Sequence, residues 1–173
     1  MAIVSPAEAA SDVAERILLS SDAFAEGEPI PAQYTCDGRD MSPALSWRDV
    51  PNGTAELVVT VEDPDADDEV FVHWMVTGID PTSPGILEGG RPQGATEGLN
   101  DFGDAGWKGP CPTWGHEPHR FVFTVLALQE HTRLPYRFTA EQLRETLDRT
   151  VILARGVLVG RYGRTPRPPV KSG

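Results

Sequence analysis

Five segments of the chain have the hydrophobic pattern of β-strands. Residues 56–62 are rich in β-branched side chains, and their apolar positions repeat on one face. Residues 71–79 and 121–128 are apolar on both alternating faces, which is typical of strands covered by other layers on both sides. Shorter strands are predicted at 44–47 and 157–161. The three longer strands therefore predict a sheet in the middle of a layered domain.

One helix is predicted near the C-terminus. Thr139 followed by Gln142 has the spacing of a capping box, in which each side chain accepts a hydrogen bond from the other residue's backbone N–H. Four apolar residues then repeat at helical spacing: Leu143, Leu147, Val151 and Ala154. Gly156 follows at a position where a left-handed residue ends a helix. The expected fold class is mainly β, as a β-rich α+β domain.

The composition fits one domain of this kind. A length of 173 residues is typical of a single domain, and 39% hydrophobic residues are enough for a core. The 17 glycines and 16 prolines are spread along the chain, which favours strands and loops over helices. We divide the chain into a leader at 1–16, a domain at 17–165 and a basic, proline-rich tail at 166–173.

The charge and the cysteine count exclude several classes of protein. A net charge of −11 repels phosphate backbones, so nucleic-acid binding is not expected. Residues 1–16 lack the basic start and apolar stretch of a secretory signal, and no apolar run is long enough to span a bilayer. The sequence predicts a cytoplasmic protein. Cys36 and Cys111 are too few for a disulfide framework, although one disulfide between them is an alternative.

The first cluster of candidate chemistry is Asp63-Pro64-Asp65-Ala66, directly after the strand at 56–62. Proline fixes its own φ and favours an extended residue before it, so the two carboxylates lie on a stiff turn. An ordinary Asx turn, in which an Asp caps local N–H groups, accounts for the same residues.

The second candidate is His73, whose immediate neighbours are apolar. A histidine in such a strand is either a core residue with a satisfied ring or a functional group, and in both cases it needs a hydrogen-bond partner when buried. The nearby carboxylates of Asp63 and Asp65 are the expected partners. An Asp–His pair favours the imidazolium form and raises the histidine pKa.

The third cluster is the Gly-Pro-Cys-Pro segment at 109–112, followed by His119 at the start of the strand at 121–128. Glycine allows a ligand to approach the main chain closely, and the flanking prolines stiffen the loop. Taken alone, this segment is also typical of a rigid turn.

In combination these motifs resemble the phosphatidylethanolamine-binding protein family, and within it the bacterial and archaeal branch often labelled Raf kinase inhibitor-like. The resemblance covers about residues 17–165, with its motifs in the family's order. The motifs are PAQYTCDG at 31–38, SPALSW at 42–47, PNGT at 51–54, DPDA at 63–66, HW at 73–74, TEGLNDFG at 96–103, GPCP at 109–112, HRF at 119–121 and GRYGR at 160–164.

The resemblance implies a large central antiparallel sheet, a second smaller sheet and a C-terminal helix. It also implies one surface pocket for phosphate, phosphoryl or carboxylate groups. The candidate ligand-binding residues are Asp63, Asp65, Ala66, His73, Gly109, Pro110, Cys111, His119 and Phe121. The family often has tyrosine where this chain has Phe121, so one hydroxyl donor is missing. Residues 113–118 also depart from the family's short glycine-rich link, so Trp114 and His116 are expected to reshape the pocket mouth.

The expected function is that of a binding protein without enzymatic activity or cofactor, acting as a monomer or homodimer. Its ligand is a small anionic or phosphorylated group, and relatives imply a kinase or protease as a further partner. A protonated His73 or His119 donates hydrogen bonds to the anion, and main-chain N–H groups near Gly109 add donors. Asp63 or Asp65 orients the imidazole and stabilises its charge.

Two enzymatic alternatives use the same residue types. Asp63, Asp65, His73 and His119 carry the donor groups of a zinc or iron hydrolase, although no H-E-x-x-H or paired C-x-x-C motif is present. Cys111 as nucleophile with His119 as base gives a cysteine-based enzyme.

Overall fold

The computed structural model describes residues 2–3 and 15–165. Four long strands and several short ones form two sheets, and the described residues contain a single α-helix. In chain order the elements are β1 (Glu15–Arg16), β2 (Leu18–Ser20), the 3₁₀ turn η1 (Ala32–Tyr34), β3 (Leu45–Arg48), β4 (Glu56–Asp63), β5 (Phe71–Ile79), β6 (Gly85–Ile86), β7 (Thr96–Glu97), β8 (His119–Leu128), α1 (Ala140–Leu147) and β9 (Ile152–Tyr162).

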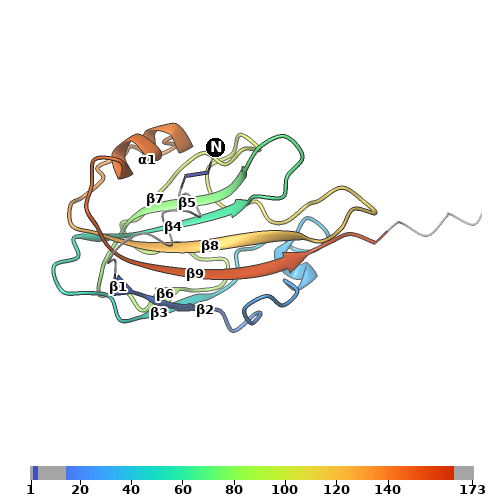
Figure 1. Cartoon of the computed structure of the whole chain (residues 1–173), viewed down its shortest axis with the longest axis horizontal. Helices are drawn as coiled ribbons and strands as arrows, with labels where there is room; N and C mark the ends of the chain where they lie inside the picture. Colours follow the sequence, from blue (N-terminus) through green and yellow to red (C-terminus); the bar gives the residue numbers. More distant parts are fainter. Residues whose placement is uncertain (1, 4–14, 166–173) are drawn as a thin grey trace, which may run out of the picture.

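The molecule has three layers (Figure 1). The six-stranded sheet has the order β1-β9-β8-β4-β5-β7 and is antiparallel except for the parallel pair of β1 and β9. The three-stranded sheet, in the order β2-β3-β6, covers one face of the large sheet, and α1 covers the other. The predicted fold class and the two-sheet arrangement are confirmed.

The long strands are apolar on both faces because they separate two hydrophobic clusters. Between the sheets, Val59 and Val61 of β4 and Phe123 of β8 pack with Trp47 of the small sheet. On the opposite face, side chains of β4, β5 and β8 pack against Leu143 of α1. This double coverage agrees with the continuous apolar pattern of these strands.

A β-bulge in β5 changes which side chains share a face. Val61 of β4 pairs with Trp74, but the next residue, Glu62, pairs with Val72, so His73 has no partner on β4. The extra residue places Val72 in the helix-side cluster and Trp74 between the sheets. The regular alternation expected for 71–79, with Val72 and Trp74 on one face, is therefore wrong at this point.

The helix has the predicted capping box but ends earlier than the spacing indicates. Thr139 Oγ1 accepts from the N–H of Gln142, and the Gln142 side chain accepts from the N–H of Thr139. The helix ends at Leu147, and Gly156 lies inside β9 rather than at a helix cap. The β-branched residues after the helix favour an extended chain, and Ile152 pairs with Leu128 of the sheet. Sheet pairing therefore overrides the helical spacing of the later apolar residues.

Parts of the predicted leader contact the domain. Glu15 and Arg16 form β1, and the buried Ile3 donates its N–H to Glu62 Oε1 at 2.8 Å. The predicted tail at 166–173 lies outside the described residues. In the part of the chain that the structure describes, no helix combines the length and the apolar character that a bilayer span requires.

We predict that Leu143→Ala lowers the free energy of unfolding by about 2–5 kcal/mol, because truncating this buried leucine leaves a cavity under α1. Leu87→Ala is the matched control: Leu87 is 83% exposed, so a change below about 0.5 kcal/mol is expected. Urea denaturation of both variants measures the difference. Equal stabilities of the two variants would contradict the role of Leu143 in holding the helix layer.

Candidate functional site

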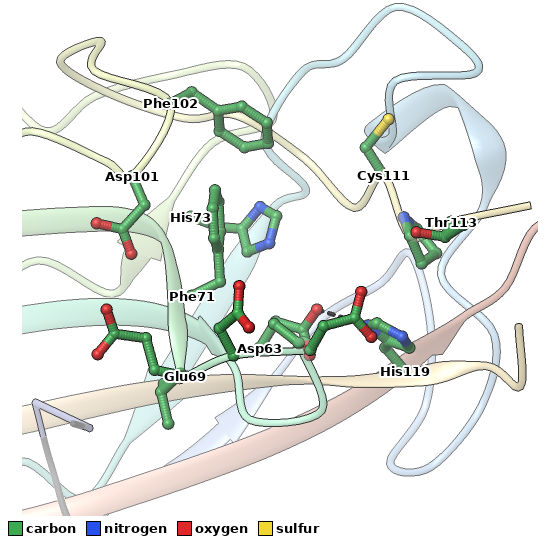
Figure 2. Close-up of a pocket in the computed structure, with 14 residues that line it drawn as sticks. Asp63, Glu69, Phe71, His73, Asp101, Phe102, Cys111, Thr113 and His119 are labelled. Carbon is green, nitrogen blue, oxygen red and sulfur yellow. Dashed lines mark hydrogen bonds and ion pairs between the residues drawn. The ribbon is translucent and has the colours of Figure 1, made fainter.

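One pocket lies where β4 ends, β5 begins and β8 begins (Figure 2). Its volume is about 540 Å³. Three segments that are distant in the sequence line it: the β4–β5 loop with the start of β5, the loop at 101–102, and 111–113 with His119. His73 and His119 both face this pocket (Figure 2). Parts of all three predicted clusters line this one cavity: Asp63 and Ala66, His73, and Cys111 with His119. The loop at 101–102 was not among the candidate ligand-binding residues.

His119 is held by a buried carboxylate. It is the first residue of β8, and Asp63 is the last residue of β4, the neighbouring strand. His119 Nδ1 lies 2.7 Å from Asp63 Oδ2, and both residues are buried. A carboxylate at this distance accepts, so Nδ1 carries a proton and Nε2 is the ring nitrogen left for a ligand. The pair fixes both the tautomer and the orientation of the ring.

His73 has a different partner from the one expected. Its Nδ1 lies 2.6 Å from the carbonyl oxygen of Lys108, while the carboxylate of Asp63 bonds His119. Burial lowers the pKa of His73, and the Lys108 carbonyl and the charge of Asp63 only partly oppose this effect. The predicted Asp–His73 pair and the upward pKa shift are both wrong, because the bulge directs the ring towards the 108–109 loop. Burial therefore disfavours the protonated form of His73.

Aromatic rings surround the His73 imidazole. The ring centroids of Phe71, Phe102 and Phe121 lie 5.1, 5.7 and 5.2 Å from it. Phe121 is fully buried and also stacks against His119 at 6.5 Å, so it supports both histidines from below instead of lining the cavity. These rings exclude water from His73, which is the physical cause of its lowered pKa.

Asp65 points away from the pocket. Arg120 donates to it from its backbone N–H and from both Nε and Nη2, at 2.8, 2.9 and 2.8 Å. This bidentate pair lowers the pKa of Asp65 to about 2. Of the two carboxylates that were expected to orient an imidazole, Asp63 does so and Asp65 bonds Arg120 instead. Alternation along β8 sends His119 and Arg120 to opposite faces. The function of the pair is to fix the Asp63–Ala66 turn.

A disulfide between Cys36 and Cys111 anchors one wall of the pocket. Cys111, Pro112 and Thr113 line the cavity, whereas Gly109 does not. The N–H of Gly109 donates to Asp40 Oδ1 at 2.7 Å, so it does not supply the donor that was expected for an anion. Gly109 instead allows close packing, since a Cβ there would collide with the Tyr34 carbonyl oxygen.

The Gly109 loop continues behind the wall. The Pro110 carbonyl accepts from the N–H of Cys36 at 3.1 Å, and Pro110 is buried outside the lining of the pocket. Gly109 and Pro110 therefore position the wall and do not form part of its surface.

Acidic side chains surround the outer part of the pocket. Asp67, Asp68, Glu69 and Asp101 line it together with the buried Asp63. Asp101 is fixed there, because its Oδ2 accepts from the N–H of Val72 at 2.6 Å. No lysine or arginine is among the described residues that line the pocket.

Comparison with known proteins identifies relatives of this chain. The family described as phosphatidylethanolamine-binding protein matches residues 20–163. The chain belongs to this family. A UPF0098 protein of Aquifex aeolicus is 40% identical over 149 residues, which are 83% of this chain and 86% of that protein.

Two solved structures of phosphatidylethanolamine-binding protein homologues have the same fold. CT736 from Chlamydia trachomatis superposes with a TM-score of 0.80 at 36% identity, over 87% of this chain and 99% of that one. YbcL from E. coli, named as a member of the mammalian family, superposes with a TM-score of 0.79 at 30% identity, over 86% and 98% of the two chains.

Of the nine candidate residues, five line the pocket of this family member: Asp63, Ala66, His73, Cys111 and His119. Sequence reasoning did not find the acidic rim or the two phenylalanines at its mouth, Phe71 and Phe102. The rim residues 67–69 directly follow the DPDA motif. The length of the β4–β5 loop was therefore a signal from which the acidic rim could have been predicted. Asp101 and Phe102 lie within the 96–103 motif.

This fold does not place the residues of the two enzymatic alternatives in the arrangements that those reactions require. Asp65 is paired with Arg120 outside the pocket, so Asp63, Asp65, His73 and His119 do not surround one point. Within residues 2–3 and 15–165, no group of three or more His, Cys, Asp or Glu is placed to hold a metal ion. Cys111 is in a disulfide and offers no thiolate for nucleophilic attack.

Asp65→Asn is expected to lower the free energy of unfolding at pH 7 by about 1 kcal/mol, a modest value because solvent screens the half-exposed Arg120. The pKa of Asp65 is lower in the folded than in the unfolded chain, so its contribution is present above about pH 4 and is lost as the pH falls towards 2. Urea denaturation across this range measures it. The exposed Asp68→Asn is the control, and a constant difference between wild type and Asp65→Asn down to pH 2 would contradict the ion pair.

We predict that the free energy of unfolding of the Cys36→Ser/Cys111→Ser double variant is about 2–5 kcal/mol lower than that of the oxidised protein. The bridge spans 75 residues and restricts the unfolded chain. Urea denaturation of the non-reduced protein and the variant gives this difference. A thiol assay on the unfolded, non-reduced chain should detect no free cysteine. Two free thiols would contradict the bridge.

Proposed function

We propose that this phosphatidylethanolamine-binding protein relative is a non-enzymatic binding protein, and that its pocket takes a small anionic group such as a phosphomonoester. The observation that carries the proposal is His119 in the pocket, backed by the buried carboxylate of Asp63 at 2.7 Å. Because Nδ1 bonds Asp63, Nε2 is left for a ligand, and in the protonated ring its N–H donates a charge-assisted hydrogen bond to an oxyanion. The exposed hydroxyl of Thr113 in the same lining is a second donor.

The size and location of the cavity support a small ligand. A volume of about 540 Å³ accommodates a phosphoryl group with a short substituent. The carboxylates at the rim oppose large or highly charged anions, since each added negative charge is repelled on entry. The proposed ligand therefore has low charge and places its oxyanion deep in the pocket, beside His119.

Binding without catalysis is supported by how the reactive side chains are used. Asp63 holds His119, Asp65 holds Arg120, and Cys111 closes the disulfide. Each of these candidate acids, bases or nucleophiles is occupied by a structural contact.

We predict that inorganic phosphate binds weakly to the pocket, through the hydrogen bond that His119 donates. His119→Ala should weaken binding at pH 6 by about tenfold or more, the loss of one charge-assisted hydrogen bond. Isothermal titration calorimetry measures both effects. His131→Ala is the matched control, since His131 contacts Glu56 and lies outside the pocket lining. Binding that is unchanged in His119→Ala would overturn the assignment of the anion site.

Regulation of a kinase or protease stays a prediction. A pull-down with the wild-type chain and with His119→Ala tests it: loss of a captured kinase or protease in the variant supports the pocket as the recognition site. The cytoplasmic location also stays a prediction, and the Cys36–Cys111 bridge favours an oxidising environment instead.

A further inference from the structure

The two imidazoles of the pocket present different hydrogen-bonding groups to a ligand. The Lys108 carbonyl has lone pairs and no proton, so the 2.6 Å contact requires that His73 Nδ1 carries the proton. In the neutral ring, Nε2 is then a lone-pair acceptor. The direct partner of His119 is the carboxylate of Asp63, so its protonated ring can donate through Nε2, whereas His73 has only a neutral carbonyl as its direct partner.

The acceptor on His73 has no other partner within the described residues. The ring bonds Lys108 through Nδ1, and no hydrogen bond to its Nε2 is formed there. Phe71, Phe102 and Phe121 surround the ring and provide no conventional donor. Figure 2 shows the ring projecting into the cavity below Phe102. A ligand that fills the cavity must therefore satisfy Nε2 with a proton of its own or leave a buried acceptor unpaired.

We propose that the pocket selects oxyanions that carry a proton, and that His73 is the residue that determines this specificity. The inference rests on the proposed anion-binding function. A monoprotonated phosphate ester has one O–H for His73 Nε2 and bare oxygens for the donor of His119. A sulfate ester has bare oxygens only, so one of them meets the Nε2 lone pair, which is repulsive.

The charge of the surroundings acts in the same direction. The groups that face the cavity around His73 are Asp63, Asp67, Asp68, Glu69, Asp101 and His119. Five carboxylates around the cavity favour a ligand with one negative charge over a ligand with two. Adding a proton to a phosphate ester lowers its charge and at the same time creates the O–H that His73 requires. Charge and hydrogen bonding therefore select the same form of the ligand.

A comparison of methyl phosphate with methyl sulfate tests whether the pocket recognises the proton of the ligand or only its charge. They have similar shapes, and near pH 6 about half of the methyl phosphate is a monoanion with one O–H, whereas methyl sulfate is a monoanion without one. Isothermal titration calorimetry at pH 6 should give at least about tenfold tighter binding of methyl phosphate. In His73→Gln, whose amide can turn an N–H towards an oxyanion, the ratio should fall to within about threefold.

Each outcome distinguishes this inference from the function on which it rests. Equal affinities for the two esters in the wild type, or tighter binding of methyl sulfate, would overturn the selection of protonated oxyanions and leave the anion site intact. Binding of neither ester would overturn both. The wild-type ratio decides the selection itself even where His73→Gln does not fold, and a tenfold ratio that persists in folded His73→Gln would overturn the role of His73. His131→Gln should keep the wild-type ratio, since His131 lies outside the pocket lining.

Discussion

The extra residue of β5 at His73 controls the geometry of the pocket. Because Glu62 pairs with Val72 and Val61 with Trp74, the chain between them bulges, and the imidazole reaches the Lys108 carbonyl. A regular strand would pair His73 with β4 and keep Val72 and Trp74 on the same face. Because of the bulge, three consecutive side chains lie in three different places. Val72 packs in the helix layer, His73 faces the pocket and Trp74 packs between the sheets.

The two buried histidines of the pocket are stabilised in different ways. His119 shares its environment with the charge of Asp63, so the cost of burial is offset by a charge-assisted hydrogen bond. His73 avoids the cost by staying neutral among aromatic rings, with a carbonyl as its partner. Both imidazoles contact Phe121, and because the side chains are identical, the chemical difference between them comes from their hydrogen-bond partners.

The parts of this structure that depend on local patterns could be predicted from the sequence. The apolar strands, the Thr139 capping box and the convergence of the DPDA, GPCP and histidine segments follow from periodicity, turn chemistry and family resemblance. The partners of His73 and Asp65 could not be predicted, because they depend on a bulge and on the register of β8 against β4. A shift of one residue exchanges the faces of a strand, and no local pattern specifies it.

The loop around Cys36 has a consequence for how the cavity can deform. None of residues 32–40 lines the pocket, but three contacts bind this loop to its wall: the disulfide to Cys111, the hydrogen bond from Gly109 to Asp40, and the close approach of Gly109 to Tyr34. Displacement of one segment therefore displaces the other. Residues 32–40 therefore contribute to the shape of the cavity through Cys111 and Gly109, although none of them lines it.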